Sequence, residues 1–168
     1  FICSFQLSAQ TSDSTLLSLD RIFNSRELTP KSFGPARWLS DGNGYTTLEA
    51  SAMFKGATDI IKYDAEKGTR EVLVGADRLI PAGSVQPLVI SNYLWSPDAK
   101  RLLIFTNTKK VWRYHTRGDY WILNLTGGKL QKLGGKAPES SLMFAKFSPD
   151  GKKVGYVSEN NLFTEEVE

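Results

Sequence analysis

The chain has 168 residues, of which 40% are hydrophobic and 23% are charged, as in ordinary soluble globular domains. Its net charge of +3 comes from 21 basic and 18 acidic residues with no basic run longer than Lys109-Lys110, which argues against nucleic-acid binding. One cysteine, Cys3, excludes an internal disulfide, and one histidine, His115, offers no metal site, so we expect neither metal nor cofactor.

The first ten residues are apolar and uncharged, and they end at a small residue, Ala9, before a polar stretch. This pattern is typical of the end of a secretory signal, so we interpret residues 1–14 as a signal-peptide remnant and polar spacer. A buried first strand and a lipid-modified Cys3 are the alternatives. The signal predicts a periplasmic or secreted protein, or a membrane-anchored one if the segment stays uncleaved.

A short helix is predicted over residues 19–23. Ser18 can cap it, and Leu19, Ile22 and Phe23 fall on one of its faces. Pro30 and Pro35 then keep the following segment extended or turned.

From residue 36 onward, one unit occurs three times: an aromatic residue, a turn rich in Ser and Asp, and an apolar run. The equivalent aromatics, Trp38, Trp95 and Phe147, lie 57 and 52 residues apart. Such spacing suits propeller blades of about 40 to 50 residues with insertions. In the second turn, Ala99 stands where the other copies have Gly, so this turn should be strained by about 1 kcal/mol or adopt another geometry.

The runs that follow these turns predict strands that are apolar on both faces, as expected of a blade between two neighbours. Third strands are predicted at residues 59–63, 120–124 and 161–164, and outer strands at residues 70–74 and 129–133. We therefore predict an all-β fold after the short N-terminal helix. It is a partial β-propeller of four-stranded antiparallel blades at about residues 36–74, 90–133 and 143–168, the last incomplete. Propellers close with about four to eight blades, so we expect a fragment of a longer protein.

The candidate functional stretch is residues 112–119, which lies between two predicted strands. It combines aromatic and basic side chains in the order Trp112-Arg113-Tyr114-His115, followed by Arg117-Gly118-Asp119. We interpret it as a long connection or a protruding hairpin, a usual place for function on a rigid scaffold. Arg117-Gly118-Asp119 is expected at its tip, with Arg117 and Asp119 in structural roles. His115 is a surface or bonded loop histidine, because the chain offers it no catalytic partner.

Three features of the chain resemble the N-terminal propeller of the dipeptidyl peptidase IV family, in its bacterial form. They are Val111-Trp112-Arg113, the Tyr-led strand after it and the order of the three turns. The resemblance covers residues 15–168. It implies a propeller that covers a C-terminal α/β-hydrolase domain of the same full-length chain and admits peptide N-termini to a serine-peptidase centre. It also implies the release of dipeptides, usually with Pro or Ala second, and allows for a homodimer of the parent enzyme.

In that resemblance, Arg113 corresponds to an arginine that bonds a backbone carbonyl of the substrate. The neighbouring residues of the stretch are candidate supporting residues: Trp112, Tyr114, His115, Arg117 and Asp119. A guanidinium suits this role because its donors form a rigid, permanently charged fork. Alternatively, Arg113 pairs with Asp119 or stacks on a neighbouring ring.

No catalytic residue is assigned. Gly-x-Ser-x-Gly is absent, so the chain alone should be inactive. Glu165-Glu166 is interpreted as an exposed strand feature rather than as the family's substrate-binding glutamate pair. The alternative function is a non-catalytic propeller module that binds a protein partner in the bacterial envelope.

Overall fold

The computed structural model describes residues 15–30 and 33–167, and it divides into two compact units, residues 1–32 and 33–168. The predicted signal remnant lies outside the described residues. In the first unit, helix α1 (Leu19–Phe23) forms as predicted, with the Ser18 hydroxyl accepting a hydrogen bond from the Arg21 N–H at 3.2 Å. Within the described residues, no helix is both long and apolar enough to cross a membrane.

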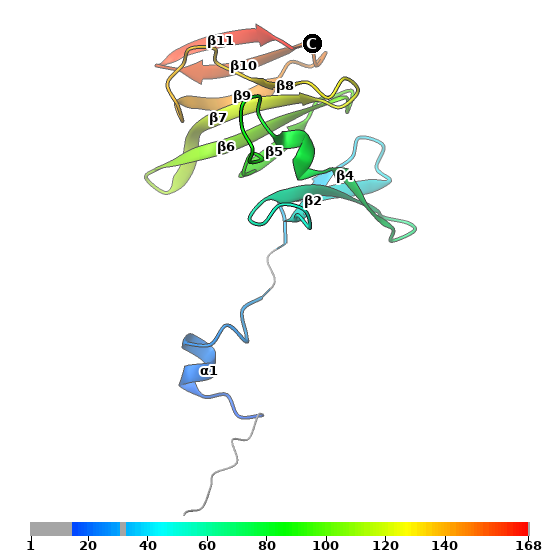
Figure 1. Cartoon of the computed structure of the whole chain (residues 1–168), viewed down its shortest axis with the longest axis vertical. Helices are drawn as coiled ribbons and strands as arrows, with labels where there is room; N and C mark the ends of the chain where they lie inside the picture. Colours follow the sequence, from blue (N-terminus) through cyan, green and yellow to red (C-terminus); the bar gives the residue numbers. More distant parts are fainter. Residues whose placement is uncertain (1–14, 31–32, 168) are drawn as a thin grey trace, which may run out of the picture. The chain divides into compact units, whose positions relative to one another are not determined.

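The second unit is built from antiparallel strands (Figure 1). Blade 1 holds β1 (Arg37–Trp38), β2 (Gly44–Ala50), β3 (Thr58–Asp64) and β4 (Arg70–Val74), and a short 3-10 turn, η1 (Ala76–Leu79), follows it. Blade 2 holds β5 (Asn92–Trp95), β6 (Arg101–Val111), β7 (Tyr114–Asn124) and β8 (Leu130–Lys132). Blade 3 holds β9 (Leu142–Phe147), β10 (Lys153–Ser158) and β11 (Asn161–Glu166). The all-β partial propeller is therefore confirmed.

Each blade pairs its strands in chain order, as successive antiparallel hairpins do. One pairing crosses between blades, because Arg117 and Gly118 of β7 lie opposite Met143 and Leu142 of β9. This contact joins blades 2 and 3 into one seven-stranded sheet. The sequence repeat did not indicate it.

The core lies on both faces of β6, as its uninterrupted apolar run predicted. Leu102 and Ile104 belong to a buried cluster shared with Ile60 and Val74 of blade 1. Leu103, between them in the sequence, belongs to a second cluster with Val154 of blade 3. Successive side chains of a strand point to opposite faces, so β6 contributes to both blade contacts.

The three repeated turns share one hydrogen-bond pattern. In the second, the Ala99 N–H donates to the Ser96 carbonyl at 2.9 Å, and in the third the Gly151 N–H donates to the Ser148 carbonyl at 2.9 Å. Ala99 has a φ of 54°, close to the 70° of Gly151. Of the two outcomes expected for Ala99, the strained turn is the one that occurs.

Candidate functional site

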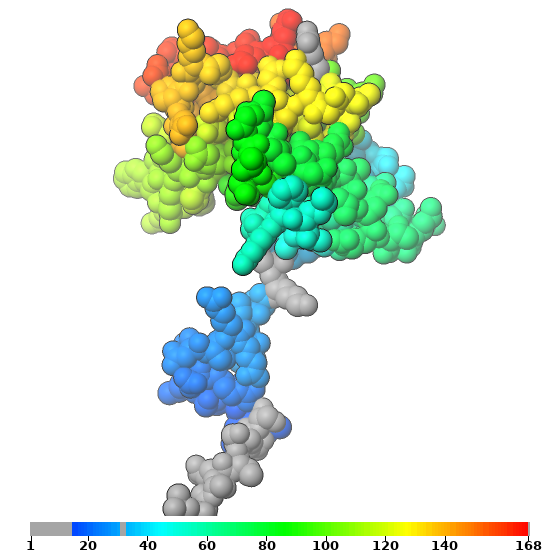
Figure 2. Space-filling model, viewed as in Figure 1, coloured from blue at the N-terminus to red at the C-terminus, as the bar shows by residue number. Residues whose placement is uncertain are grey.

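The candidate functional stretch forms a protruding hairpin. Strands β6 and β7 remain paired as far as Val111 and Tyr114, so the connection between them is Trp112-Arg113 alone. The hairpin, yellow-green in Figures 1 and 2, extends beyond the rest of the blade. Both strands are longer than predicted because their outer halves are polar and exposed, and apolar periodicity gives no signal there.

The tip of the hairpin presents three neighbouring side chains to solvent. Trp112 is 94% exposed and Tyr114 is 73% exposed, and Arg113 is exposed between them. Trp112 also has a φ of 61°, a left-handed conformation that is strained for a bulky residue. The two exposed aromatic rings form an apolar surface at the tip, which is available for binding.

Arg113 has no hydrogen-bond, ion-pair or ring partner among the described residues. The predicted alternatives, pairing with Asp119 and stacking on Trp112 or Tyr114, are therefore not observed. Its guanidinium donors remain available for a ligand.

Asp119 lies at the opposite end of the hairpin, at its base, and is 5% exposed. Its carboxylate accepts hydrogen bonds from Asn107 Nδ2 and from the Ser140 N–H, both at 2.9 Å. Lys132 Nζ lies 3.5 Å from the same carboxylate. Asp119 thus fixes the base of the hairpin against the connection that leads to blade 3.

The expected position of Arg117-Gly118-Asp119 at the tip is wrong, because all three residues lie within β7. A side chain at Gly118 would come within 2.4 Å of the Phe105 ring and 2.7 Å of the Thr106 carbonyl oxygen. The glycine is thus explained by close packing of the two strands, while Arg117 remains exposed on the hairpin.

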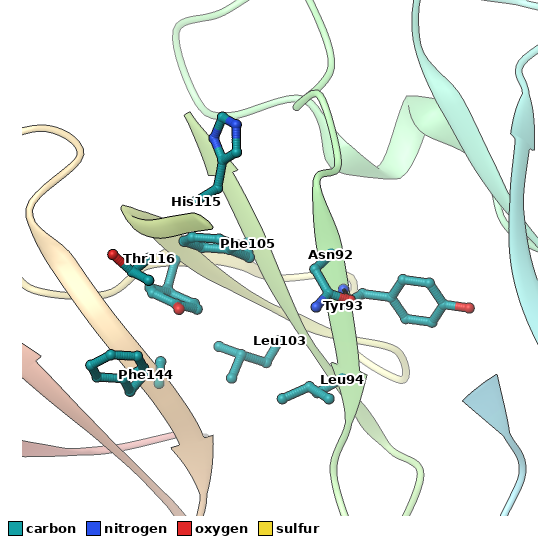
Figure 3. Close-up of a pocket in the computed structure, with 10 residues that line it drawn as sticks. Asn92, Tyr93, Leu94, Leu103, Phe105, His115, Thr116 and Phe144 are labelled. Atoms are coloured by element: carbon teal, nitrogen blue, oxygen red, sulfur yellow. Dashed lines mark hydrogen bonds between the residues drawn. The ribbon is translucent and has the colours of Figure 1, made fainter. Parts of the chain in front are cut away.

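A cleft of about 200 Å³ lies at the base of the hairpin (Figure 3). His115 and Thr116 come from β7, Phe105 from β6, and Phe144 from β9. The His115 Nδ1 atom lies 2.8 Å from the Thr108 hydroxyl, so His115 is a bonded residue of the hairpin. Phe105 stacks on Tyr120, with ring centroids 4.6 Å apart, and burial raises the pKa of the Tyr120 phenol.

The cleft also uses Asn92 and Leu94 of β5, which the sequence did not single out. Arg37 of blade 1 donates from its terminal guanidinium nitrogen to Asn92 Oδ1 at 2.8 Å and so holds this amide in place. Figure 3 shows the Tyr93 ring pointing away from the cleft, and its hydroxyl bonds Thr46 of blade 1 at 2.9 Å. Such contacts join residues 47 to 55 positions apart in the chain, beyond the reach of any local pattern.

Glu165 and Glu166 lie in β11, but Glu165 is not the exposed residue that we expected. Its carboxylate accepts hydrogen bonds from the Gly134 N–H at 2.9 Å and from the Tyr156 hydroxyl at 2.5 Å. Burial, reinforced by this carboxylate, raises the pKa of Tyr156 to about 12. Glu166 is exposed, with Lys153 Nζ 3.6 Å away. The two side chains therefore lie in different environments and do not form a paired site.

Among residues 15–30 and 33–167, no group of three His, Cys, Asp or Glu residues is arranged to hold a metal ion.

The blades and the exposed hairpin define a region of the β-propeller class. Residues 96–168 match the family model described as the dipeptidyl peptidase IV N-terminal region. Together with the relatives described next, this match supports the interpretation of the chain as an N-terminal region of the dipeptidyl peptidase IV family.

Dipeptidyl aminopeptidase B of Saccharomyces cerevisiae is 26% identical over 157 residues, which cover 93% of this chain and 18% of the yeast protein. A probable dipeptidyl-aminopeptidase B of Neosartorya fischeri is 36% identical over 76 residues, covering 45% of this chain and 8% of that protein. The crystal structure of Porphyromonas gingivalis dipeptidyl peptidase 4 matches with a TM-score of 0.69 at 25% identity, over 89% of this chain and 20% of that chain. This chain therefore spans a fifth or less of these relatives.

Proposed function

We propose that this chain is the substrate-gating and substrate-binding propeller portion of a serine-type dipeptidyl peptidase. Its relatives are dipeptidyl aminopeptidases and a dipeptidyl peptidase, which supports release of N-terminal dipeptides by the parent protein. In this proposal, the preferred second residue of the substrate is Pro or Ala. On the basis of the signal-like residues 1–14, the proposal also assigns the parent enzyme to the periplasm or the outside of the cell.

The observation that carries this proposal is the free guanidinium of Arg113 at the tip of the hairpin. A charged donor fork without a protein partner can bond the backbone carbonyl of a peptide without first breaking an internal contact. Because the hydrogen bonds of Asp119 anchor the base of the β6–β7 hairpin, the hairpin can hold Arg113 at its tip in a defined position.

The parent enzyme needs two further partners in this proposal. The peptide substrate supplies a free N-terminus, and a C-terminal α/β-hydrolase domain of the same full-length chain supplies the nucleophile. This chain contains no Gly-x-Ser-x-Gly elbow of its own. A homodimer of the parent enzyme is compatible with these roles.

The test replaces Arg113 in the full-length enzyme. Arg113→Ala should cost about 1.5 to 3 kcal/mol of transition-state binding, as for hydrogen bonds to charged groups. This loss corresponds to roughly a 10- to 150-fold lower kcat/KM for a Gly-Pro chromogenic amide. Arg113→Lys should recover little, because an ammonium lacks the planar fork.

The control is Arg117→Ala, which removes a guanidinium from strand β7 rather than from the tip. It should retain most of the wild-type kcat/KM, and neither variant should lower the melting temperature. Normal kcat/KM in Arg113→Ala, or a loss that follows a lowered melting temperature, would assign Arg113 to the shape of the hairpin instead.

A further inference from the structure

The hairpin carries the positive charge excess of the entire chain. Residues 107–118 include four basic side chains and no acidic one, and the rest of the chain holds 17 basic and 18 acidic residues. The four are Lys109, Lys110, Arg113 and Arg117, and all of them are exposed. In the part of the chain that the structure describes, none of them forms an ion pair with a carboxylate.

The carboxylate that follows this segment does not offset its charge. Asp119 is buried at the base, where two N–H donors and Lys132 already satisfy it. The exposed part of the hairpin therefore has an unbalanced positive field, which attracts anionic ligands and is strongest within a Debye length of roughly 8 Å at physiological salt.

The surroundings of the hairpin fit a flexible peptide. The cleft at its base has a volume of about 200 Å³, the scale of one or two side chains, and Phe105, Phe144, His115 and Asn92 offer it both apolar and polar contacts. Trp112 and Tyr114 add exposed aromatic surface at the tip. Aromatic and cationic side chains along a narrow hairpin can contact successive residues of an extended peptide.

We propose that the hairpin binds the part of a peptide substrate that follows the released dipeptide, and that it favours peptides with Asp or Glu there. This inference rests on the proposed function, in which Arg113 bonds a backbone carbonyl of the dipeptide that is released. Strands and extended peptides both advance roughly 3.3 Å per residue, so Lys109 and Lys110, three to four residues from Arg113, lie within reach of acidic residues about two to four positions beyond the scissile bond.

The test compares two hexapeptides, Gly-Pro-Gly-Glu-Glu-Gly and Gly-Pro-Gly-Gln-Gln-Gly, as substrates of the full-length enzyme. Two exposed charge pairs should raise kcat/KM for the acidic peptide about 3- to 10-fold over the neutral one at low salt. Because exposed charges are screened, this ratio should fall toward one in about 0.5 M NaCl.

The double variant Lys109→Gln/Lys110→Gln should bring the ratio close to one at low salt. The matched control, Lys55→Gln/Lys67→Gln, removes the same charge from two exposed positions of blade 1 and should keep the wild-type ratio. Melting temperatures of both variants would verify that the fold is intact.

The outcomes separate this inference from the proposed function. Suppose that the full-length enzyme cleaves a Gly-Pro chromogenic amide. The acidic preference alone would then be overturned if the wild type cleaved the acidic and neutral peptides with equal kcat/KM, or if the Lys109→Gln/Lys110→Gln variant kept the wild-type ratio of the two. A full-length enzyme that cleaves no Gly-Pro substrate would overturn the proposed function and this inference with it.

Discussion

At the scale of single residues, Ala99 is a position where sequence and backbone conflict. Its φ of 54° places a Cβ in the left-handed region, where the equivalent residues Gly42 and Gly151 have none. Ala99→Gly should stabilise the chain by about 0.5 to 1 kcal/mol, because relief of this strain exceeds the greater flexibility of glycine in the unfolded state. Chemical denaturation of the two proteins measures the difference.

The reciprocal control is Gly151→Ala. A Cβ at Gly151 would meet its nearest neighbour, Pro97 Cδ, at 3.5 Å, an ordinary contact, so its cost should come from the backbone alone. It should destabilise the chain by about the amount that Ala99→Gly stabilises it. Equal stability of wild type and Ala99→Gly would show that the turn relaxes around alanine.

At the scale of elements, the β6–β7 hairpin depends on its base. Asp119→Ala would leave the buried Ser140 N–H and the Asn107 amide without their acceptor. We expect a loss of about 1 to 3 kcal/mol in the free energy of unfolding, the usual cost of an unsatisfied buried group. Thermal and urea unfolding would measure it.

Arg117→Ala serves as the matched control on the same strand, because its side chain is exposed. It should change the free energy of unfolding by less than about 0.5 kcal/mol. If the two variants were equally stable, the hydrogen bonds of Asp119 would contribute nothing to anchoring the hairpin.

At the scale of the whole molecule, strand β6 links the three blades of the second unit. Leu102 and Leu103 are 0% and 1% exposed and belong to clusters on opposite faces of the strand. Leu102→Ala and Leu103→Ala should each cost about 2 to 5 kcal/mol through lost burial and a residual cavity. Denaturant unfolding, followed by tryptophan fluorescence, tests both variants.

Leu162→Ala is the control of the same chemistry, because Leu162 of β11 is 76% exposed. Its effect should stay within about 0.5 kcal/mol. A large loss from one β6 variant and none from the other would mean that one face of the strand is less tightly packed than its burial indicates.

Local patterns in the sequence predicted the repeated parts of this protein well. The capping Ser18, the three turns and the doubly apolar run of β6 each depend on neighbours within a few residues, and each forms as predicted. The outer half of the hairpin was harder to predict because its strands lie in solvent, where polar and basic residues keep no alternation. The tip was therefore placed at Arg117-Gly118-Asp119 instead of Trp112-Arg113.

The sequence by itself determined the fold class and the short helix, because backbone propensity and turn chemistry are properties of short segments. The binding role of Arg113 stays a prediction that came from the family resemblance. The tertiary structure decided the burial of Asp119, the hydrogen bonds of Glu165, the pairing of β7 with β9 and the cleft that Asn92 shares with Phe144. These features join residues from 21 to 52 positions apart. Their formation depends on how neighbouring blades pack, which a local pattern does not encode.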